Sequence, residues 1–194
     1  MKTTTTFIIA LLISLQTIAG GFQVNLQGQR SAGMGHTGTG LRLGAASGFF
    51  NPGALAFSGT EVLIGINLIS SRIRYREHQP GVYNAESNSS IGTPFHGHIA
   101  IKPTEDSPLV FGLSAYTPFG SSVSYDDDWK GQFLLREISL AAIFYQGTVA
   151  FKVNEKLGIG AAYVLGTGDF TLRRGVPVQN ADGSFGEANL AGDG

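Results

Sequence analysis

The chain has 194 residues, of which 14% are charged, 42% are hydrophobic and 28 are glycine. Soluble domains carry about 25% charged residues, and glycine here occurs at about twice its average frequency. The formal net charge of −1 gives no general electrostatic basis for nucleic-acid binding. The absence of cysteine excludes disulfides and thiolate metal sites. This composition favours a β-protein whose surface partly faces lipid.

A secretory signal peptide is predicted over residues 1–19. Lys2 supplies the positive start, residues 7–13 (FIIALLI) form the apolar core, and Thr17 and Ala19 precede a cleavage site. The apolar core is too short for a permanent anchor, and no later stretch approaches the length of a transmembrane helix. We therefore expect an exported protein whose mature chain begins near Gly20.

Residues 20–60 differ in composition from the rest of the chain. They are rich in Gly, Ala, Ser and Thr and show no helical apolar stripe, which indicates a compact, irregular segment that needs external support. From residue 61 onward the pattern changes to strands separated by turn residues. We predict one segment over residues 20–60 and a β-domain over residues 61–194.

Five strand candidates follow in chain order. The first, residues 61–76, places alternate apolar residues on one face as far as Leu68, where the phase shifts as at a bulge or a membrane boundary. The second, residues 95–102, points His96 and His98 away from its apolar face. The others cover residues 109–117, residues 134–153 with a bend at Gly147, and residues from 157 onward.

The connections between these candidates alternate in length. Residues 77–94, 119–133 and 173 onward are long connections, whereas residues 103–108 and 154–156 are short ones. Short turns at one end and long loops at the other are typical of a transmembrane barrel, and a soluble β-sandwich has no reason to sort its loops by length. The sequence therefore predicts an all-β protein, a transmembrane antiparallel β-barrel. Because such barrels have even numbers of strands and only about five are present, with the chain ending in a predicted loop, we expect a fragment.

Three stretches of the chain resemble the FadL/TodX (OMPP1) family of outer-membrane transporters for long-chain fatty acids and hydrocarbons. They are the mature start GGFQVN (20–25); SAGMG (31–35) with NPGAL (51–55); and YTPFG (116–120) with KVNEKLGIG (152–160). One departure is Gly53, where the family usually has alanine. The resemblance implies a monomeric, fourteen-stranded barrel in the bacterial outer membrane that is filled by an N-terminal plug at residues 20–60.

The resemblance also implies a route for the substrate. A fatty acid or hydrocarbon enters from the outer loops by passive diffusion and leaves sideways beside Pro118, Phe119 and Gly120, where the third strand is kinked. Phe22, Asn51 and Pro52 of the plug control access. Locally, Pro118 removes a ladder donor and Gly120 relaxes the backbone, although the same residues also fit a plain strand end. The implied partners are the hydrophobic substrate, outer-membrane lipid and lipopolysaccharide, with no cofactor.

Several polar groups have two interpretations. His96 and His98 could ligate a metal, but no third ligand is evident, so a polar row facing the lumen is preferred. Arg72, Arg74 and Arg76 could contact a fatty-acid carboxylate or a lipopolysaccharide phosphate, or could be ordinary charge at the membrane rim. The run 126–128 (DDD) could bind calcium or belong to a solvated outer loop beside an interfacial Trp129.

Catalytic motifs give no support for an enzyme. Residues 33–38 match G-x-G-x-x-G, but they follow no strand and open no helix, so a dinucleotide site is rejected. No G-x-S-x-G, HExxH or P-loop occurs in the chain. We therefore expect a transporter; an outer-membrane barrel enzyme acting on lipids and a structural or adhesive barrel remain the alternatives.

Overall fold

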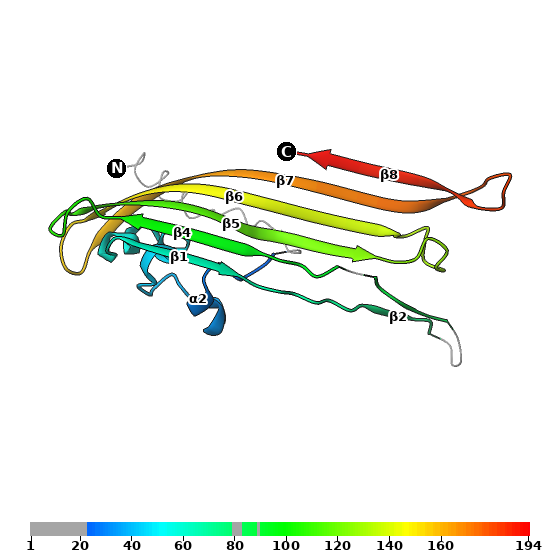
Figure 1. The fold of residues 1–194 in the computed structure, drawn as a ribbon, viewed down its shortest axis with the longest axis horizontal. Helices are drawn as coiled ribbons and strands as arrows, with labels where there is room; N and C mark the ends of the chain where they lie inside the picture. The colour runs from blue at the N-terminus through cyan, green and yellow to red at the C-terminus, as the bar shows by residue number, and fades with distance from the viewer. Residues whose placement is uncertain (1–22, 79–82, 89) are drawn as a thin grey trace, which may run out of the picture.

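The computed structural model describes residues 23–78, 83–88 and 90–194 (Figure 1). The predicted signal peptide and Phe22 lie outside the described residues. The described chain forms one six-stranded antiparallel sheet in the order β1-β4-β5-β6-β7-β8 and a separate two-stranded sheet, β2-β3. The strands are β1 (Glu61–Ile66), β2 (Arg74–Arg76), β3 (Asn84–Glu86), β4 (Phe95–Ile101), β5 (Leu109–Ser124), β6 (Glu137–Lys152), β7 (Gly158–Gln179) and β8 (Phe185–Asp193).

The segment before β1 folds into short helices against one face of the sheet. These are α2 (Gln29–Gly33), η1 (Gly44–Ala46), α3 (Ser47–Phe50) and η2 (Pro52–Phe57). Leu55 of η2 is fully buried in a cluster with Ala100, Val110 and Ala150, which project from three neighbouring strands. In the part of the chain that the structure describes, no helix has the length and apolar character needed to cross a membrane.

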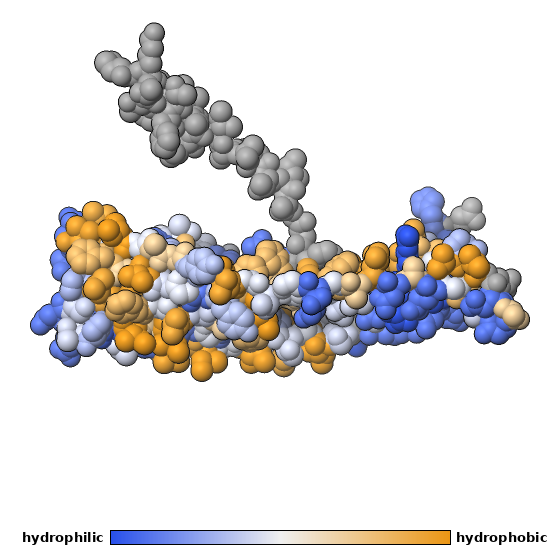
Figure 2. Space-filling model, turned by 90° about the horizontal axis from the view of Figure 1, so that it is seen from above, coloured by the Kyte–Doolittle hydropathy of each residue, from blue (hydrophilic) through white to orange (hydrophobic). Residues whose placement is uncertain are grey.

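The two faces of the sheet differ as strand alternation requires. On β4, His96, His98 and Ala100 are buried against the N-terminal segment, while Ile99 and Ile101 point the other way and are exposed. The exposed face is apolar, and none of the helices in the described residues covers it. Figure 2 shows apolar residues over much of the length of the molecule and hydrophilic residues gathered toward one end. The apolar face is therefore the lipid-facing outer wall.

The strands extend further than the sequence indicated. β5 continues to Ser124, so the predicted loop at residues 119–133 is wrong in its first part, and β8 occupies residues 185–193, where a loop was predicted. A strand of about 9–11 residues crosses a membrane, whereas β7 has 22. The additional residues lie beyond the part of the sheet that has the apolar outer face. There, successive side chains do not alternate clearly between apolar and polar, so the sequence of these strands resembles that of a loop. The sheet is open, with β1 and β8 as its edges.

The first predicted strand is divided. β1 ends at Ile66, and residues 67–73 then pair with residues 87–94 in an arm that leads to β2 and β3: the Asn67 amide donates to the Pro94 carbonyl at 2.9 Å, and Ile69 bridges to Gly92. Figure 1 shows this arm at the end of the molecule opposite the short turns 102–108 and 153–157. The predicted sorting of connections between the two ends therefore holds, although strand pairing shortens the long ones.

Candidate functional site: a window in the β-wall

The β4–β5 ladder stops part-way along β5. Its last backbone pair joins His96 and Tyr116. The next connection comes from a side chain: the Thr117 hydroxyl accepts from the Phe95 amide at 3.0 Å and donates to the Phe95 carbonyl at 3.2 Å. Beyond it, the described residues 90–94 and 119–123 share no backbone hydrogen bond. We call the stretch between these two segments the window.

The far edge of the window is closed by another pair of hydrogen bonds. The Asn88 amide donates to the Ser124 carbonyl at 2.8 Å, and the Ser124 hydroxyl donates to the Asn88 carbonyl at 3.2 Å. The window thus has a border at both ends rather than being a frayed sheet edge. A cavity of about 510 Å³ lies there, lined by aliphatic, small and aromatic residues that include Ile69, Ile91, Phe95, Phe119 and Ile143.

Pro118 accounts for the interruption. Proline has no amide to donate to a neighbouring strand, and it confines the backbone to a narrow φ range. The β5–β6 register shifts between Tyr116 and Phe119, which marks a bulge at this point. Residues 90–94 keep their pairing with residues 67–73 on the β1 side but have no ladder with β5 on the other side. The kink expected from Pro118 therefore lies within a strand and does not end it.

The chain just before α2 crosses this free edge of β5. Gln23 bridges to Phe119, and the Val24 amide donates to the Pro118 carbonyl at 2.8 Å. The Gln27 side-chain amide donates to the Thr117 carbonyl at 3.1 Å and to the Val24 carbonyl at 2.6 Å. These bonds satisfy β5 acceptors that a neighbouring strand would otherwise satisfy. Residues 23–27 therefore act as a short substitute strand beside the window, and we call them the tip.

Gln27 connects the tip to the helices. Its side chain is 2% exposed, and its Oε1 accepts from His36 Nε2 at 2.9 Å. Burial lowers the pKa of His36, which favours the neutral ring that this bond uses. Sequence reasoning missed Gln27 because a single glutamine in a Gly- and Ser-rich segment carries no periodic signal.

The other end of the N-terminal segment is held by close backbone contact. The Asn51 side chain caps η2, accepting from the Gly53 amide at 3.1 Å and donating to the Thr39 carbonyl at 3.0 Å. A Cβ added at Gly53 would lie 2.6 Å from the Gly158 carbonyl oxygen of β7. The departure from alanine at Gly53 thus permits an approach that alanine would obstruct. We call this contact between η2 and β7 the base.

The base and the window are well separated. Pro52 lies against Gly160 of β7, whereas the row of pairs through Tyr116 reaches β7 at Gly166. Six residues of strand correspond to about 20 Å. The predicted gating residues therefore form two groups: Pro118, Phe119 and Gly120 border the window beside the tip, and Asn51 and Pro52 form the base.

A family model for outer membrane protein transport proteins (OMPP1/FadL/TodX) matches residues 10–192. The chain belongs to this family. A FadL homologue from Pseudomonas aeruginosa, known from a crystal structure, has a similar fold, with a TM-score of 0.62 and 19% sequence identity. The match covers 90% of this chain and 47% of that one, so the chain spans about half the length of the homologue. No match is found among curated proteins.

Membership of the FadL/TodX family confirms three sequence predictions. They are the family resemblance, the outer-membrane location and the antiparallel β-barrel class. Six strands of the described chain make up the sheet, one more than expected. The prediction of the family from the sequence rested on the order in which the quoted motifs occur along the chain, because each motif alone is short and unspecific.

The predicted arginines lie on the outer arm of this FadL-family chain. Arg74 of β2 pairs with Glu86 of β3 at 3.3 Å, and both side chains are largely exposed. Arg72 and Arg76 flank it and do not line the window cavity. Their contact with an anionic group therefore stays a prediction. Arg173 of β7, a further cation near the outer end, is paired with Glu137 at 3.0 Å and Glu187 at 2.9 Å.

The histidine pair faces the N-terminal segment, as the alternation of β4 predicted. The rings of His96 and His98 are 5.6 Å apart, and Nδ1 of His98 lies 2.8 Å from the Ser114 hydroxyl. Among the described residues, no group of three or more potential ligands is close enough to hold a metal ion. The pair is therefore a polar part of the inner wall.

The acidic outer loop is more ordered than the sequence indicated. Oδ1 of Asp126 accepts from the Asn88 side chain at 2.6 Å, directly beside the far border of the window. Trp129 was expected at the membrane interface, but it is 8% exposed and stacks on Tyr125 with ring centroids 4.2 Å apart. Its indole donates to the Leu135 carbonyl at 2.6 Å. Trp129 therefore packs inside the loop that follows β5.

Proposed function

We propose that this protein carries hydrophobic compounds, long-chain fatty acids or hydrocarbons, across the outer membrane by passive diffusion. In this proposal, the N-terminal segment is the plug of the barrel. The substrate passes from the outer end into the barrel and leaves sideways through the window into the membrane. The observation that carries the proposal is the window itself, a bordered interruption of the wall that is lined mainly by apolar residues and has the tip beside it.

Lateral exit suits the chemistry of the substrate. Each CH₂ group costs about 0.8 kcal/mol to transfer from apolar surroundings to water. A long acyl chain that continued down an aqueous axial channel would meet this cost along its whole length. The window lies instead between apolar side chains of both faces, Phe119 on the inner face beside Ala142 and Phe95 on the outer face, and Ile91 also lines its cavity. The acyl chain thereby remains in apolar surroundings from the barrel interior to the lipid.

The test is to restore a regular strand at the kink. Replacing Pro118 with Thr and Gly120 with Val in the complete protein supplies a ladder donor and strand-forming side chains. Uptake of radiolabelled oleate should fall about tenfold or more, the effect of about 1.4 kcal/mol on a barrier. Surface abundance and heat resistance on unboiled gels should stay normal. Unchanged uptake in a well-folded variant would place the exit elsewhere.

The same preparation separates the other two classes of function. An enzyme acting on lipids would release hydrolysis products from vesicles, and the loss of that release on substitution of one Ser or His would favour it. A structural or adhesive barrel would neither bind nor release oleate. A transporter equilibrates oleate between the two sides and leaves it chemically unchanged.

A further inference from the structure

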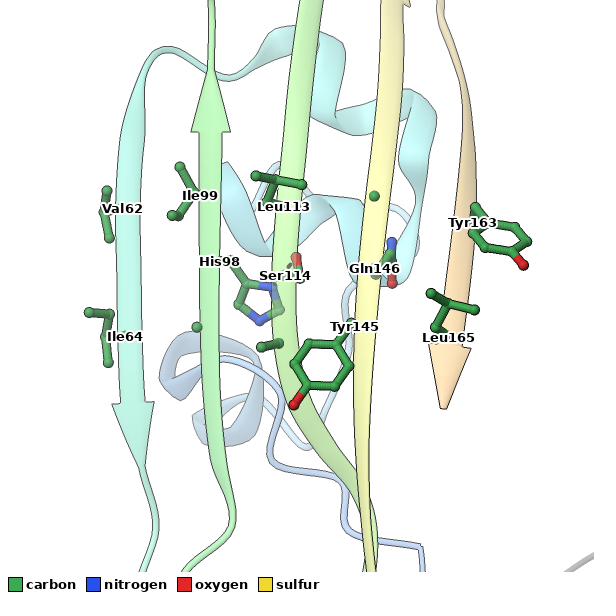
Figure 3. A pocket seen from close by; sticks show the side chains of 13 residues that line it. Val62, Ile64, His98, Ile99, Leu113, Ser114, Tyr145, Gln146, Tyr163 and Leu165 are labelled. Carbon is green, nitrogen blue, oxygen red and sulfur yellow. Dashed lines mark hydrogen bonds between the residues drawn. The ribbon is translucent and has the colours of Figure 1, made fainter. Parts of the chain in front are cut away.

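The lipid-facing wall is hollowed next to the window. A cavity of about 480 Å³ lies over β1, β4, β5, β6 and β7, within the size range of ligand pockets (Figure 3). Its sides are formed by apolar and aromatic residues that point away from the N-terminal segment: Val62, Ile64, Ile99, Leu113, Tyr145, Tyr163 and Leu165. We call this cavity the outer groove.

The floor of the outer groove consists of small residues in adjacent strands. Gly97 pairs with Ala115, Ala115 pairs with Tyr145, and Gly147 pairs with Leu113 and Tyr163. A lipid-facing wall made of larger side chains at these positions would have no hollow. The outer groove thus results from two glycines and one alanine within a surface of otherwise bulky apolar side chains.

Inner packing does not require these glycines. A Cβ added at Gly147 would meet nothing within 4 Å, and the nearest atom to a Cβ at Gly97 would be 3.9 Å away. Neither residue has a positive φ. Glycine inside a strand is destabilising relative to residues with a side chain. Gly97 and Gly147 therefore leave open space on the outer face of the sheet. Gly53 and Gly158 differ from them because they permit close contact between two backbones.

The outer groove begins where the window ends. Gly97 and Ala115 lie two residues along β4 and β5 from Phe95 and Thr117, the pair that borders the window. Side chains two residues apart on a strand share a face, so these residues form one continuous track on the outer wall. A chain that emerges through the window therefore reaches the groove by passing over Phe95 and Thr117, the pair at their common border.

Two residues bring a hydroxyl group to this apolar surface: Tyr163, which pairs with Gly147 of the floor, and Tyr145, which pairs with Ala115. Within the described residues, the Tyr145 hydroxyl has no hydrogen-bond partner, although half of the side chain is exposed on the lipid face. A tyrosine in apolar surroundings usually finds a partner for its O–H. A carboxyl group is a strong hydrogen-bond acceptor, whereas a hydrocarbon or the acyl chain of a membrane lipid has no acceptor along its length.

We infer that the outer groove binds one free fatty acid after it has passed the window, with its carboxyl group at the Tyr145 hydroxyl and its chain over Gly97, Ala115 and Gly147. This inference rests on the proposed lateral exit. Its function is to hold the product against the wall until it disperses into the membrane. Because lipid tails are as apolar as the groove, its selectivity comes from fit and from the single hydrogen bond.

The binding test uses photolabelling of the complete protein in vesicles. The probe is a long-chain fatty acid with a diazirine in the middle of its chain, and labelled residues are mapped by mass spectrometry. Label should appear at Leu113, Ile99 and Tyr145 and should be displaced by excess oleate. Gly147→Leu should lower this labelling about tenfold, and Tyr145→Phe should lower it for the acid but not for a diazirine-bearing alkane of the same length, which has no hydrogen-bond acceptor. Ala161→Leu, which adds apolar bulk on the same wall outside the groove, is the matched control.

A phospholipid with the same diazirine distinguishes a specific site from ordinary lipid contact. Equal labelling by both probes, insensitive to oleate, would overturn the inference. The straightened Pro118 and Gly120 variant separates the groove from the exit. In that variant, probe added outside should not reach the groove, whereas probe dissolved in the vesicle membrane should still label it. Lost uptake in the variant, with no displaceable labelling in the parent protein, would retain the exit and reject the groove.

Discussion

At the scale of single residues, Gln27 contributes two of the hydrogen bonds that attach the tip to the rest of the protein. Its amide reaches the Thr117 carbonyl, and its oxygen accepts from His36. Each such bond contributes about 0.5–1.5 kcal/mol net, so the loss of any one weakens the attachment without unfolding the barrel. His36 also packs against Phe50, with ring centroids 4.9 Å apart, which explains why its ring is kept from water.

The lowered pKa of His36 makes this attachment pH-dependent. Its pKa lies below 6.5 in the folded segment, so the released segment binds more protons once the pH falls below 6.5. The free energy that holds the tip is therefore fully present above 6.5 and decreases as the pH falls through the folded pKa. The protection of the amides of residues 23–36 against hydrogen exchange, taken relative to their intrinsic exchange rates at each pH, should therefore decrease as the pH falls below 6.5. His36→Gln, which can donate the same bond but does not titrate, should lack this His36-dependent part; an identical pH profile in both proteins would contradict the assignment.

At the scale of elements, the base depends on backbone contact between η2 and β7. Gly53, Gly158 and Gly160 bring two backbones closer than any side chain allows. Further attachment comes from Gln146 of β6, whose side chain donates to the Gly48 carbonyl at 2.7 Å and accepts from the Tyr116 hydroxyl at 2.8 Å. The base is therefore fixed at several points, in contrast to the tip.

Adding one methyl group at the base should show this difference. Gly53→Ala places a Cβ against the Gly158 carbonyl, so η2 must shift, at a cost of about 1–3 kcal/mol for an overpacked site. The expected results are faster hydrogen exchange in residues 44–57 and an unchanged barrel. Gly59→Ala is the control, because a Cβ there meets nothing within 4 Å. Equal hydrogen exchange in both variants would mean that the base accommodates the added methyl group without a shift of η2.

The sequence predicted elements well where alternation is strong. The strand expected at residues 95–102 is β4, Phe95–Ile101, and its buried and exposed faces are as the side chains indicated. Residues 119–124 and 185–193 were missed because polar strands beyond the membrane lack an apolar face. The window could be anticipated from Pro118, but its partner Gln27 could not, since the contact joins residues 90 positions apart.

At the scale of the whole molecule, the N-terminal segment has a fixed base and a lightly held tip about 20 Å away. A rigid plug that left the barrel would have to break the backbone contacts at β7 and the Gln146 bonds together. Among the described residues, release of the tip breaks the bonds to Pro118, Thr117 and Phe119 and the bond between Gln27 and His36. Movement of the tip is therefore the less costly way to clear the window, and the base would remain in place during transport.

A reversible cross-link between the tip and β5 tests this movement. A Cβ built at Gly120 would lie 3.9 Å from Cγ2 of Val24, so side chains at these two positions are in contact, and the chain has no cysteine of its own. In the double variant Val24→Cys and Gly120→Cys, oxidation should hold the tip at the window and lower oleate uptake about tenfold, and reduction should restore it. Val24→Cys alone, treated in the same way, controls for the oxidant. If the oxidised double variant takes up oleate as fast as the reduced one, the tip does not need to move, and the window is passable as it stands.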